Sequence, residues 1–547
     1  MPVLNWIGKD AVVNHHRAVP YRLVHCDGAA SAGDRAAGNL LVQGDNLEAL
    51  KALLPYYGGQ VKCIYIDPPY NTGNEGWVYN DNVNAPDMRA WLGRVVGREA
   101  EDLSRHDKWL CMMYPRLRLL RDFLRQDGVI FVSIGDDSLH HLRNLLDEIF
   151  LPQNFLENVI WQKSYAPRSS AKHFSSSHEY VISYCKNLKE FQLNSLPRTN
   201  KQNSVYKNLD NDPRGPWRPN NLAARNYYSK GTYPITCPGG RIINGPPRGS
   251  YWRVSKEKFL ALDADNRIYW GKDGNNVPAP KIFLSEVSKG RTPETIWTYD
   301  EVGHSQEAKK EVLSILEFED NDEVFITPKP VRLIKQIIQL ATSPGDLILD
   351  SFARSGTTGH AVLDLNKQDG GNRRFILVEM EEPIATKVTA ARLRRVITGY
   401  NRGGDPDKPV GGLGGGFRYC RLGAALFDEF GDISAGVTFA DLAAHIFFTE
   451  TGMPIPSRAT GTTPLLGTHG DRAVYLLFSP ESPAQEEGSG TTPGTVLTPD
   501  ALATLPAPPK GFNGTQVIYA GGTTIPPDRL RTQNIAFKQI PYQIEGA

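Results

Sequence analysis

The residues with the clearest chemical potential are Asp67, Pro68, Pro69 and Tyr70, which follow the apolar run at residues 61–66. That run is short, rich in β-branched side chains and nearly uncharged, which predicts a buried parallel strand. The two prolines then exclude both helix and ladder pairing, so the chain must leave the sheet in a stiff turn. A carboxylate, a carbonyl held by proline and a flat ring are thereby fixed at the carboxyl end of a strand, where open α/β sheets place their ligands.

This set of groups suits the task of holding a planar exocyclic amine. The carboxylate of Asp67 and the carbonyl of Pro68 can each accept a hydrogen bond from the amine, while the Tyr70 ring stacks on the plane of the base. Chemically this is an acceptor site for a methyl group. The alternative is a strand followed by a simple Pro-Pro turn, and the continuation Asn71-Thr72-Gly73 favours the acceptor site.

The segment 67–73 resembles the catalytic motif of the amino-methyltransferases that modify adenine N6 or cytosine N4 in DNA, and aspartate at its first position favours adenine. The resemblance implies direct methyl transfer from S-adenosylmethionine to a base flipped out of the duplex. It also implies that Asp67, Pro68, Pro69 and Tyr70 are the catalytic residues. Cytosine N4 stays open as the acceptor, because the same geometry serves any amine attached to a ring.

Two further strand ends suit a cofactor. Residues 346–350 predict a strand that leads into the small-residue loop 351–359 and a helix beginning near His360, which lets a ligand approach the backbone closely. Residues 373–379 predict the next strand, and Glu379 stands at its carboxyl end, where dinucleotide folds bind ribose hydroxyls.

The turn at residues 44–46 separates a predicted strand from a leucine-rich helix, for which Asp45 or Asn46 is a candidate N-cap. In the amino-methyltransferases the matching turn faces the adenine of S-adenosylmethionine, which gives Asp45 a second role. The resemblance thus places the cofactor on residues of the turn, the loop and the ribose-binding strand end: Asp45, Asp350, Phe352, Ser355, Gly356, Thr357 and Glu379.

The order of these segments is informative, because the catalytic turn comes first, a basic region next and the cofactor loop last. This order is similar to that of the permuted β group and of the modification subunits of type III restriction systems, and the resemblance covers about residues 38–400, including 177–181. One position departs from it, since the family usually has glycine where this chain has Arg354. Arginine does not easily adopt the dihedral angles or the close ligand approach that glycine allows. The side chain is therefore expected either to point outward or to weaken cofactor binding.

Residues 161–260 break the alternation of strands and helices. They hold 17 Lys/Arg and 5 Asp/Glu with aromatic residues threaded among them, which indicates a nucleic-acid surface, the alternative being a solvated basic face. Many Pro, Gly and Asn residues favour loops, so the region is predicted to be a recognition insertion. The candidate DNA contacts are Lys163, Arg168, Lys172, Arg218, Arg225, Arg248 and Arg253.

The composition limits the class of protein. The chain has 547 residues, with 61 Lys/Arg against 60 Asp/Glu, which predicts two or three domains and gives no overall preference for nucleic acid. Its six cysteines are scattered, which predicts neither a metal site nor a disulfide framework and fits a reducing cytoplasm. Without an apolar run of membrane length, it is expected to be soluble and free of the membrane.

Together these observations predict an α/β protein with a Rossmann-like methyltransferase fold and a mainly parallel sheet. The expected parts are an arm (1–37), a catalytic half (38–165), the recognition insertion (166–325), a cofactor-binding half (326–400), a linker (401–416) and a small α/β interaction module (417–547). Residues 401–547 hold 10 basic and 14 acidic residues, so this last part is expected to bind a protein and not DNA. The expected partners are double-stranded DNA, a second copy of the chain, and a restriction or other defence subunit that would supply cleavage.

Overall fold

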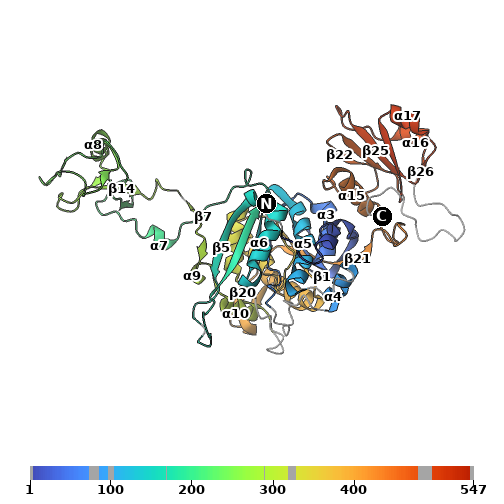
Figure 1. The fold of residues 1–547 in the computed structure, drawn as a ribbon, viewed down its shortest axis with the longest axis horizontal. Helices are drawn as coiled ribbons and strands as arrows, with labels where there is room; N and C mark the ends of the chain where they lie inside the picture. The colour runs from blue at the N-terminus through green and yellow to red at the C-terminus, as the bar shows by residue number, and fades with distance from the viewer. Residues whose placement is uncertain are drawn as a thin grey trace. The chain divides into compact units, whose positions relative to one another are not determined.

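The computed structural model describes residues 4–72, 86–96, 104–167, 169–288, 290–317, 328–478 and 496–541 (Figure 1). The chain divides into two compact units. Unit 1 comprises Met1–Asn194 and Glu294–Ala547, and unit 2 comprises Ser195–Pro293.

Unit 1 is built on a mixed sheet whose described strands are predominantly parallel. Pairing is parallel from β21 through β4 and between β5 and β16, and antiparallel at β1–β21, β4–β6 and β6–β5. The predicted Rossmann-like, mainly parallel sheet is therefore confirmed. In spatial order its strands are β1 (Arg22–Gly33), β21 (Gly416–Ala425), β2 (Leu40–Gln43), β18 (Arg374–Glu379), β17 (Leu347–Asp350), β3 (Val61–Ile66), β4 (Leu124–Ile134), β6 (His178–Cys185), β5 (Phe155–Gln162) and β16 (Ile296–Trp297).

Helices cover both faces of this sheet because the central strands are apolar on both sides. Ile64, Leu349 and Val378 share one core cluster with residues of α3 (Asn46–Tyr57), α5 (Arg105–Phe123) and α6 (Asp136–Phe150). Alternate strand residues point to the opposite face. There α11 (Val331–Ala341), α12 (Thr357–Asp369) and α14 (Ala391–Thr398) pack in succession, with α11 against β3 and α12 against β18. The other described α-helices of this part are α1 (Lys9–Val12), α2 (His15–Ala18), α4 (Pro86–Val95), α9 (Tyr299–Val302), α10 (Ser305–Ile315) and α13 (Glu382–Ile384).

The two ends of the methyltransferase-like region differ from expectation. The expected arm contains β1, an edge strand of the main sheet, and β1 pairs with β21, which begins where the expected linker ends. The sheet therefore extends over both predicted boundaries. Cys26 and Cys420 are direct partners in this pairing and form a disulfide, so the expectation of no disulfide was wrong. A sequence separation of 394 residues hides such a pair from any spacing argument.

A smaller α/β module follows β21, as predicted. Its sheet orders β22 (Leu465–His469), β23 (Arg472–Leu476), β25 (Thr515–Ala520) and β27 (Ile535–Gln539), accompanied by α15 (Phe439–Thr451), α16 (Pro499–Thr504) and α17 (Pro527–Thr532). The short pair β24–β26 (Val496–Leu497, Gly522–Thr523) completes it, whereas the pair β19–β20 (Gly399–Asn401, Pro409–Gly411) precedes β21 and contacts α14. Across the described residues, no helix combines the length and hydrophobicity needed to cross a bilayer.

Unit 2 consists of short strands and loops around a small aromatic core. The described elements are α7 (Asn200–Asn203), α8 (Lys256–Ala264) and the strands β8 (Trp217–Pro219), β9 (Ala223–Ala224), β10 (Ile235–Thr236), β11 (Ile242–Ile243), β12 (Tyr251–Trp252), β13 (Ile268–Tyr269) and β14 (Ala279–Phe283). β7 (Leu196–Pro197) pairs with β15 (Gly290–Arg291) where the unit begins and ends. The unit is narrower than the expected insertion, because β6 and α10 belong to unit 1.

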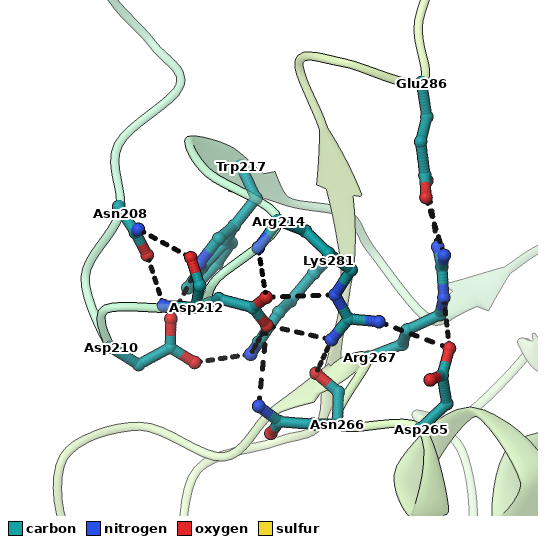
Figure 2. Close-up of polar contacts among 10 residues, drawn as sticks. All are labelled: Asn208, Asp210, Asp212, Arg214, Trp217, Asp265, Asn266, Arg267, Lys281 and Glu286. Carbon is teal, nitrogen blue, oxygen red and sulfur yellow. Dashed lines mark hydrogen bonds and ion pairs between the residues drawn. The ribbon is translucent and has the colours of Figure 1, made fainter.

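An ion-pair network stabilises unit 2 from within (Figure 2). The fully buried carboxylate of Asp212 forms ion pairs with the Arg214 guanidinium at 2.9 Å and with the ammonium of Lys281, which is also fully buried, at 3.0 Å. Arg267 joins Asp265 and Glu286, each at 2.6 Å. With Asp210, which pairs with Lys281, the network holds four of the seven Asp/Glu of residues 195–293, and the same residues contain 17 Lys/Arg, so basic residues dominate the charge of unit 2.

Candidate active site

The catalytic turn leaves the sheet directly after β3, whose six residues are all buried. Pro69 is held from the side, because the Nε1 group of Trp109 donates a hydrogen bond of 2.7 Å to its carbonyl oxygen. Asn71 follows in the left-handed region at φ 61°, and its side-chain amide lies 3.1 Å from Nδ1 of His106. These contacts fix the backbone on both sides of the turn.

Two cations hold the carboxylate of Asp67, which is only 4% exposed. The ammonium of Lys329 lies 2.7 Å from Oδ1, and the guanidinium of Arg354 lies 3.3 Å from Oδ2. Burial acts to raise the pKa of Asp67, but the charges of Arg354 and Lys329 outweigh it and keep the pKa below its ordinary value. The carboxylate is thus ionised and remains a hydrogen-bond acceptor.

The ring of Tyr70 is positioned by its hydroxyl and by a glycine. The hydroxyl donates a 3.0 Å hydrogen bond to Glu179, which also pairs with Lys163 at 2.9 Å. A Cβ atom on Gly135 would lie 3.2 Å from the ring, so glycine permits its close approach at the start of α6. Lys329 lies 5.0 Å from the ring centroid. Glu179 therefore connects the tyrosine to β6, within the segment 177–181.

The predicted cofactor loop follows β17, which lies between β18 and β3. Asp350 accepts hydrogen bonds from the Phe352 amide at 3.0 Å and from the Thr358 hydroxyl at 2.5 Å. Burial raises the pKa of Asp350 to about 7. Gly356 stands at the N-cap of α12 with φ 73°, a conformation that suits glycine. The carboxylate of Glu379 is turned toward this loop and accepts the Arg354 amide at 2.7 Å.

A buried arginine supports the loop from α14. The guanidinium of Arg392 donates to the Ser355 carbonyl at 3.2 Å and to the Thr357 hydroxyl at 2.9 Å, and its side chain is fully buried. Burial lowers the pKa of Arg392 from its ordinary value, opposed by Glu311. The main work of this side chain is therefore to hold two predicted cofactor-binding residues in place.

The turn at Asp45 lines a cavity of about 690 Å³. Asp45 is the N-cap of α3, accepting from the Leu47 amide at 2.9 Å, and its other oxygen pairs with Arg116 at 2.9 Å. Met380 and Glu381, just beyond β18, line the same cavity. Its size and mixed lining fit the adenosine part of S-adenosylmethionine, with Asp45 and the end of β18 as the residues that would hold it.

At the loop itself the space is much smaller. A second cavity, lined by Asp67, Asp350, Phe352 and Arg354, has a volume of about 20 Å³, on the order of what one water molecule needs. Arg354 adopts the left-handed φ of 48° and its side chain is 10% exposed. Of the two expectations for this residue, the outward orientation is wrong. Arg354 is thus one of the residues that narrow the space at the predicted cofactor loop.

The predicted DNA contacts divide between the two units. Lys163 belongs to the Glu179 pair beside Tyr70, Lys172 is exposed in unit 1, and Arg168 lies outside the described residues. In unit 2, Arg218 donates a 3.2 Å hydrogen bond to the Tyr206 hydroxyl. Arg225 and Arg253 are exposed and line an open cavity of about 720 Å³ together with exposed tyrosines, and Arg248 is exposed nearby.

Comparison with known proteins agrees with this geometry. Residues 61–390 match the family described as DNA methylase. The chain belongs to this DNA methylase family. It is 35% identical over 412 residues to the type III restriction-modification enzyme StyLTI Mod subunit of Salmonella typhimurium, covering 73% of this chain and 60% of the relative. It is 31% identical to the EcoPI Mod subunit of Escherichia phage P1 (70% and 64%) and 27% identical to the EcoP15I Mod subunit of Escherichia coli (73% and 66%).

The chain thus spans 60% to 66% of the lengths of these three relatives. Within the matched methylase region lie the residues of the acceptor turn and of the cofactor loop. The sequence did not identify Lys329, Glu179, Trp109 or Arg392 as parts of the site. The only local signal for any of them was the 177–181 segment, which contains Glu179.

Proposed function

We propose that this DNA methylase transfers a methyl group from S-adenosylmethionine to the N6 amine of an adenine flipped out of duplex DNA. The observation that carries this proposal is the juxtaposition of Asp67 and Asp350 at the ends of the adjacent strands β3 and β17, with Tyr70 held by Glu179 beside them. An acceptor site and a cofactor loop on neighbouring strands can bring two reactants together. Catalysis is then mostly orientation.

The residues of the chain act on the acceptor. When bound, S-adenosylmethionine supplies an electrophilic methyl group. The amine of adenine is a poor nucleophile because its lone pair is delocalised into the ring. Hydrogen bonds from the amine to the Asp67 carboxylate and the Pro68 carbonyl localise and aim that lone pair, and Tyr70 stacks on the base. A carboxylate has about four acceptor positions, so Asp67 can receive the amine while it stays paired with Lys329.

The proposed DNA surface includes the exposed cations of unit 2. Residues 221–258 contain seven Lys/Arg and one Asp/Glu, and four of the seven Asp/Glu of unit 2, namely Asp210, Asp212, Asp265 and Glu286, are paired within the network of Figure 2. Among the described contacts, no ion pair involves Arg225, Arg248 or Arg253. These side chains are therefore available for phosphates, and the exposed Tyr227 and Tyr228 for bases.

The test of the reaction is incorporation of labelled methyl groups into DNA, followed by analysis of the modified nucleosides. N6-methyladenine is expected, and N4-methylcytosine would overturn the choice of base. Tyr70→Ala should abolish incorporation, and Asp67→Asn should reduce it about a hundredfold or more. Tyr56→Phe is the matched control, because it also removes a tyrosine hydroxyl from a carboxylate, that of Asp441, outside the site. Full activity of Tyr70→Ala would disprove the catalytic assignment.

A second candidate function is a DNA-reading subunit with weak methylation activity, which the inward position of Arg354 favours. Calorimetry separates the two, since such a subunit would bind DNA tightly and S-adenosylmethionine poorly.

We also propose that the chain acts in the cytoplasm, as a homodimer and with a restriction subunit. The relatives' description as Mod subunits of restriction-modification enzymes supports a larger assembly. Light scattering of the purified chain tests the dimer.

A further inference from the structure

The connection between β5 and β6 is unusually long for two adjacent antiparallel strands. β5 ends at Gln162 and β6 begins at His178, which leaves residues 163–177 between them. Hairpins normally need two to five connecting residues, and loops longer than about 12–15 residues without secondary structure are uncommon in compact domains, where they are usually either functional or linker-like. We call residues 163–177 the β5–β6 loop. Its length is more than the sheet requires.

Both ends of the β5–β6 loop are tied to the acceptor site. At its start, the Lys163 ammonium lies 2.9 Å from Glu179, and the Lys163 amide donates a 2.9 Å hydrogen bond to the Ser177 carbonyl. At its end, Glu179 accepts the hydroxyl of Tyr70 at 3.0 Å. The loop therefore leaves and rejoins the sheet beside the ring that is proposed to stack on the target base.

Two large aromatic side chains of the described part of this loop are exposed, Tyr165 at 55% and Phe174. Phe174 is 98% exposed, the highest fraction among the large apolar side chains of the described residues. It precedes Glu179 by five residues, a length that spans at most about 18 Å even when extended. Phe174 is thus kept close to the acceptor site while making little contact with the protein.

The surroundings of Phe174 fit DNA. Residues 164–178 contain Arg168, Lys172 and two histidines but no aspartate or glutamate, and the other residues are mainly serine and alanine. Such a segment attracts phosphates and offers little bulk to exclude a duplex. Apolar side chains carried by basic segments insert between base steps and unstack them.

We propose that Phe174 is a wedge that enters the base stack as the target base leaves it. This role rests on the proposed function and adds a DNA-contacting residue to it. Extrusion of a paired base costs on the order of a few kcal/mol, and a side chain that occupies the vacated space offsets part of that cost. The other exposed features of the loop, Lys172 among them, would hold the phosphates on either side.

The test uses a duplex oligonucleotide that carries the sequence methylated by the wild-type chain, read from modified-base mapping in an expressing host. Phe174→Ala should lower the single-turnover methylation rate on this duplex by roughly tenfold or more. On a duplex with an abasic site opposite the target base, where extrusion is already easy, its rate should be within about threefold of wild type. Phe174→Trp should retain the rate on both duplexes.

The matched control is Phe430→Ala, because Phe430 is 81% exposed and lies in a different part of unit 1. It should behave as wild type on both duplexes. A rate for Phe174→Ala that equals wild type on the paired duplex overturns the wedge, as does an equal loss on both duplexes. A wild-type chain that methylates no DNA overturns the proposed function itself, and the wedge with it.

Discussion

Replacing Arg354 with glycine should tighten the binding of S-adenosylmethionine. The guanidinium of Arg354 lies 3.3 Å from Asp67 Oδ2 and borders the small cavity at the cofactor loop, so it must move before the methionine part can enter. At an effective dielectric constant of about 20, the Coulomb attraction across this distance is roughly 5 kcal/mol. Desolvation of the two charges cancels much of it, which leaves a net value of about 1–2 kcal/mol.

That net value converts to a gain in affinity of about five- to thirtyfold for Arg354→Gly. Stability should change less. Glycine relieves the positive φ at this position, but its greater freedom in the unfolded chain and the lost ion pair act in the opposite direction, so the free energy of unfolding should shift by about 1 kcal/mol or less.

Arg354→Ala separates the two effects. It removes the guanidinium but keeps a side chain at φ 48°, so it should match the glycine variant in affinity and be less stable than it by about 1 kcal/mol. Calorimetric titration with S-adenosylmethionine, with and without DNA, measures the dissociation constants, and thermal unfolding measures stability. Weaker binding by Arg354→Gly would mean that the arginine contacts the donor's carboxylate or a DNA phosphate. Unchanged affinity would show that it does not obstruct the site, and either result refutes the reasoning.

Further outcomes are expected at the loop and on unit 2. Because the pKa of Asp350 is raised to about 7, its contribution to stability is fully present below about pH 4 and is lost as the pH rises toward 7. Asp350→Asn should remove this dependence of stability on pH. If the melting temperature of the variant and of the wild type changed with pH in parallel, the prediction would be contradicted. Arg392→Met should weaken cofactor binding by about tenfold, because Arg392 donates hydrogen bonds to Ser355 and Thr357. The affinity for DNA should change little. An equal loss of both affinities would indicate general unfolding. Deletion of residues 195–293 should remove most of the salt-dependent DNA binding. DNA titrations between 50 and 200 mM salt check this, because a protein that makes about 6–10 phosphate contacts loses roughly three to five orders of magnitude in affinity over that range.

The sequence predicted those parts of the fold and site whose signals are local. The strand predicted at residues 373–379 matches β18 (Arg374–Glu379), because its apolar run is bounded by arginines at one end and by Glu379 at the other. The strand before Asp67 and the loop after Asp350 were placed for a similar reason, since prolines and small residues mark the ends of strands. The residue types at the ends of these elements indicate where each element begins and ends.

The residues that the sequence missed act across long distances in the chain. Lys329 reaches Asp67 from 262 residues away, and Arg392 reaches Ser355 from a helix that the sequence did not connect to the loop. The edge strand β1 and its neighbour β21 were missed because each is partly exposed and contains glycine, which gives weak alternation of apolar and polar residues. Pairing between distant segments leaves no pattern that a single sequence reveals.

Asp67 shows how local and distant information combine. The motif alone supplies a carboxylate at a strand end, and its burial would favour the protonated form, which cannot accept two hydrogen bonds as strongly. Lys329 and Arg354 reverse this preference and keep the group ionised. Of the two charges, that of Arg354 lowers the pKa of Asp67 more, although Arg354 stands where the family usually has glycine. The arginine therefore both supports the ionisation of Asp67 and borders the small cavity at the cofactor loop, so its removal should change the protonation of the acceptor carboxylate as well as the affinity for the methyl donor.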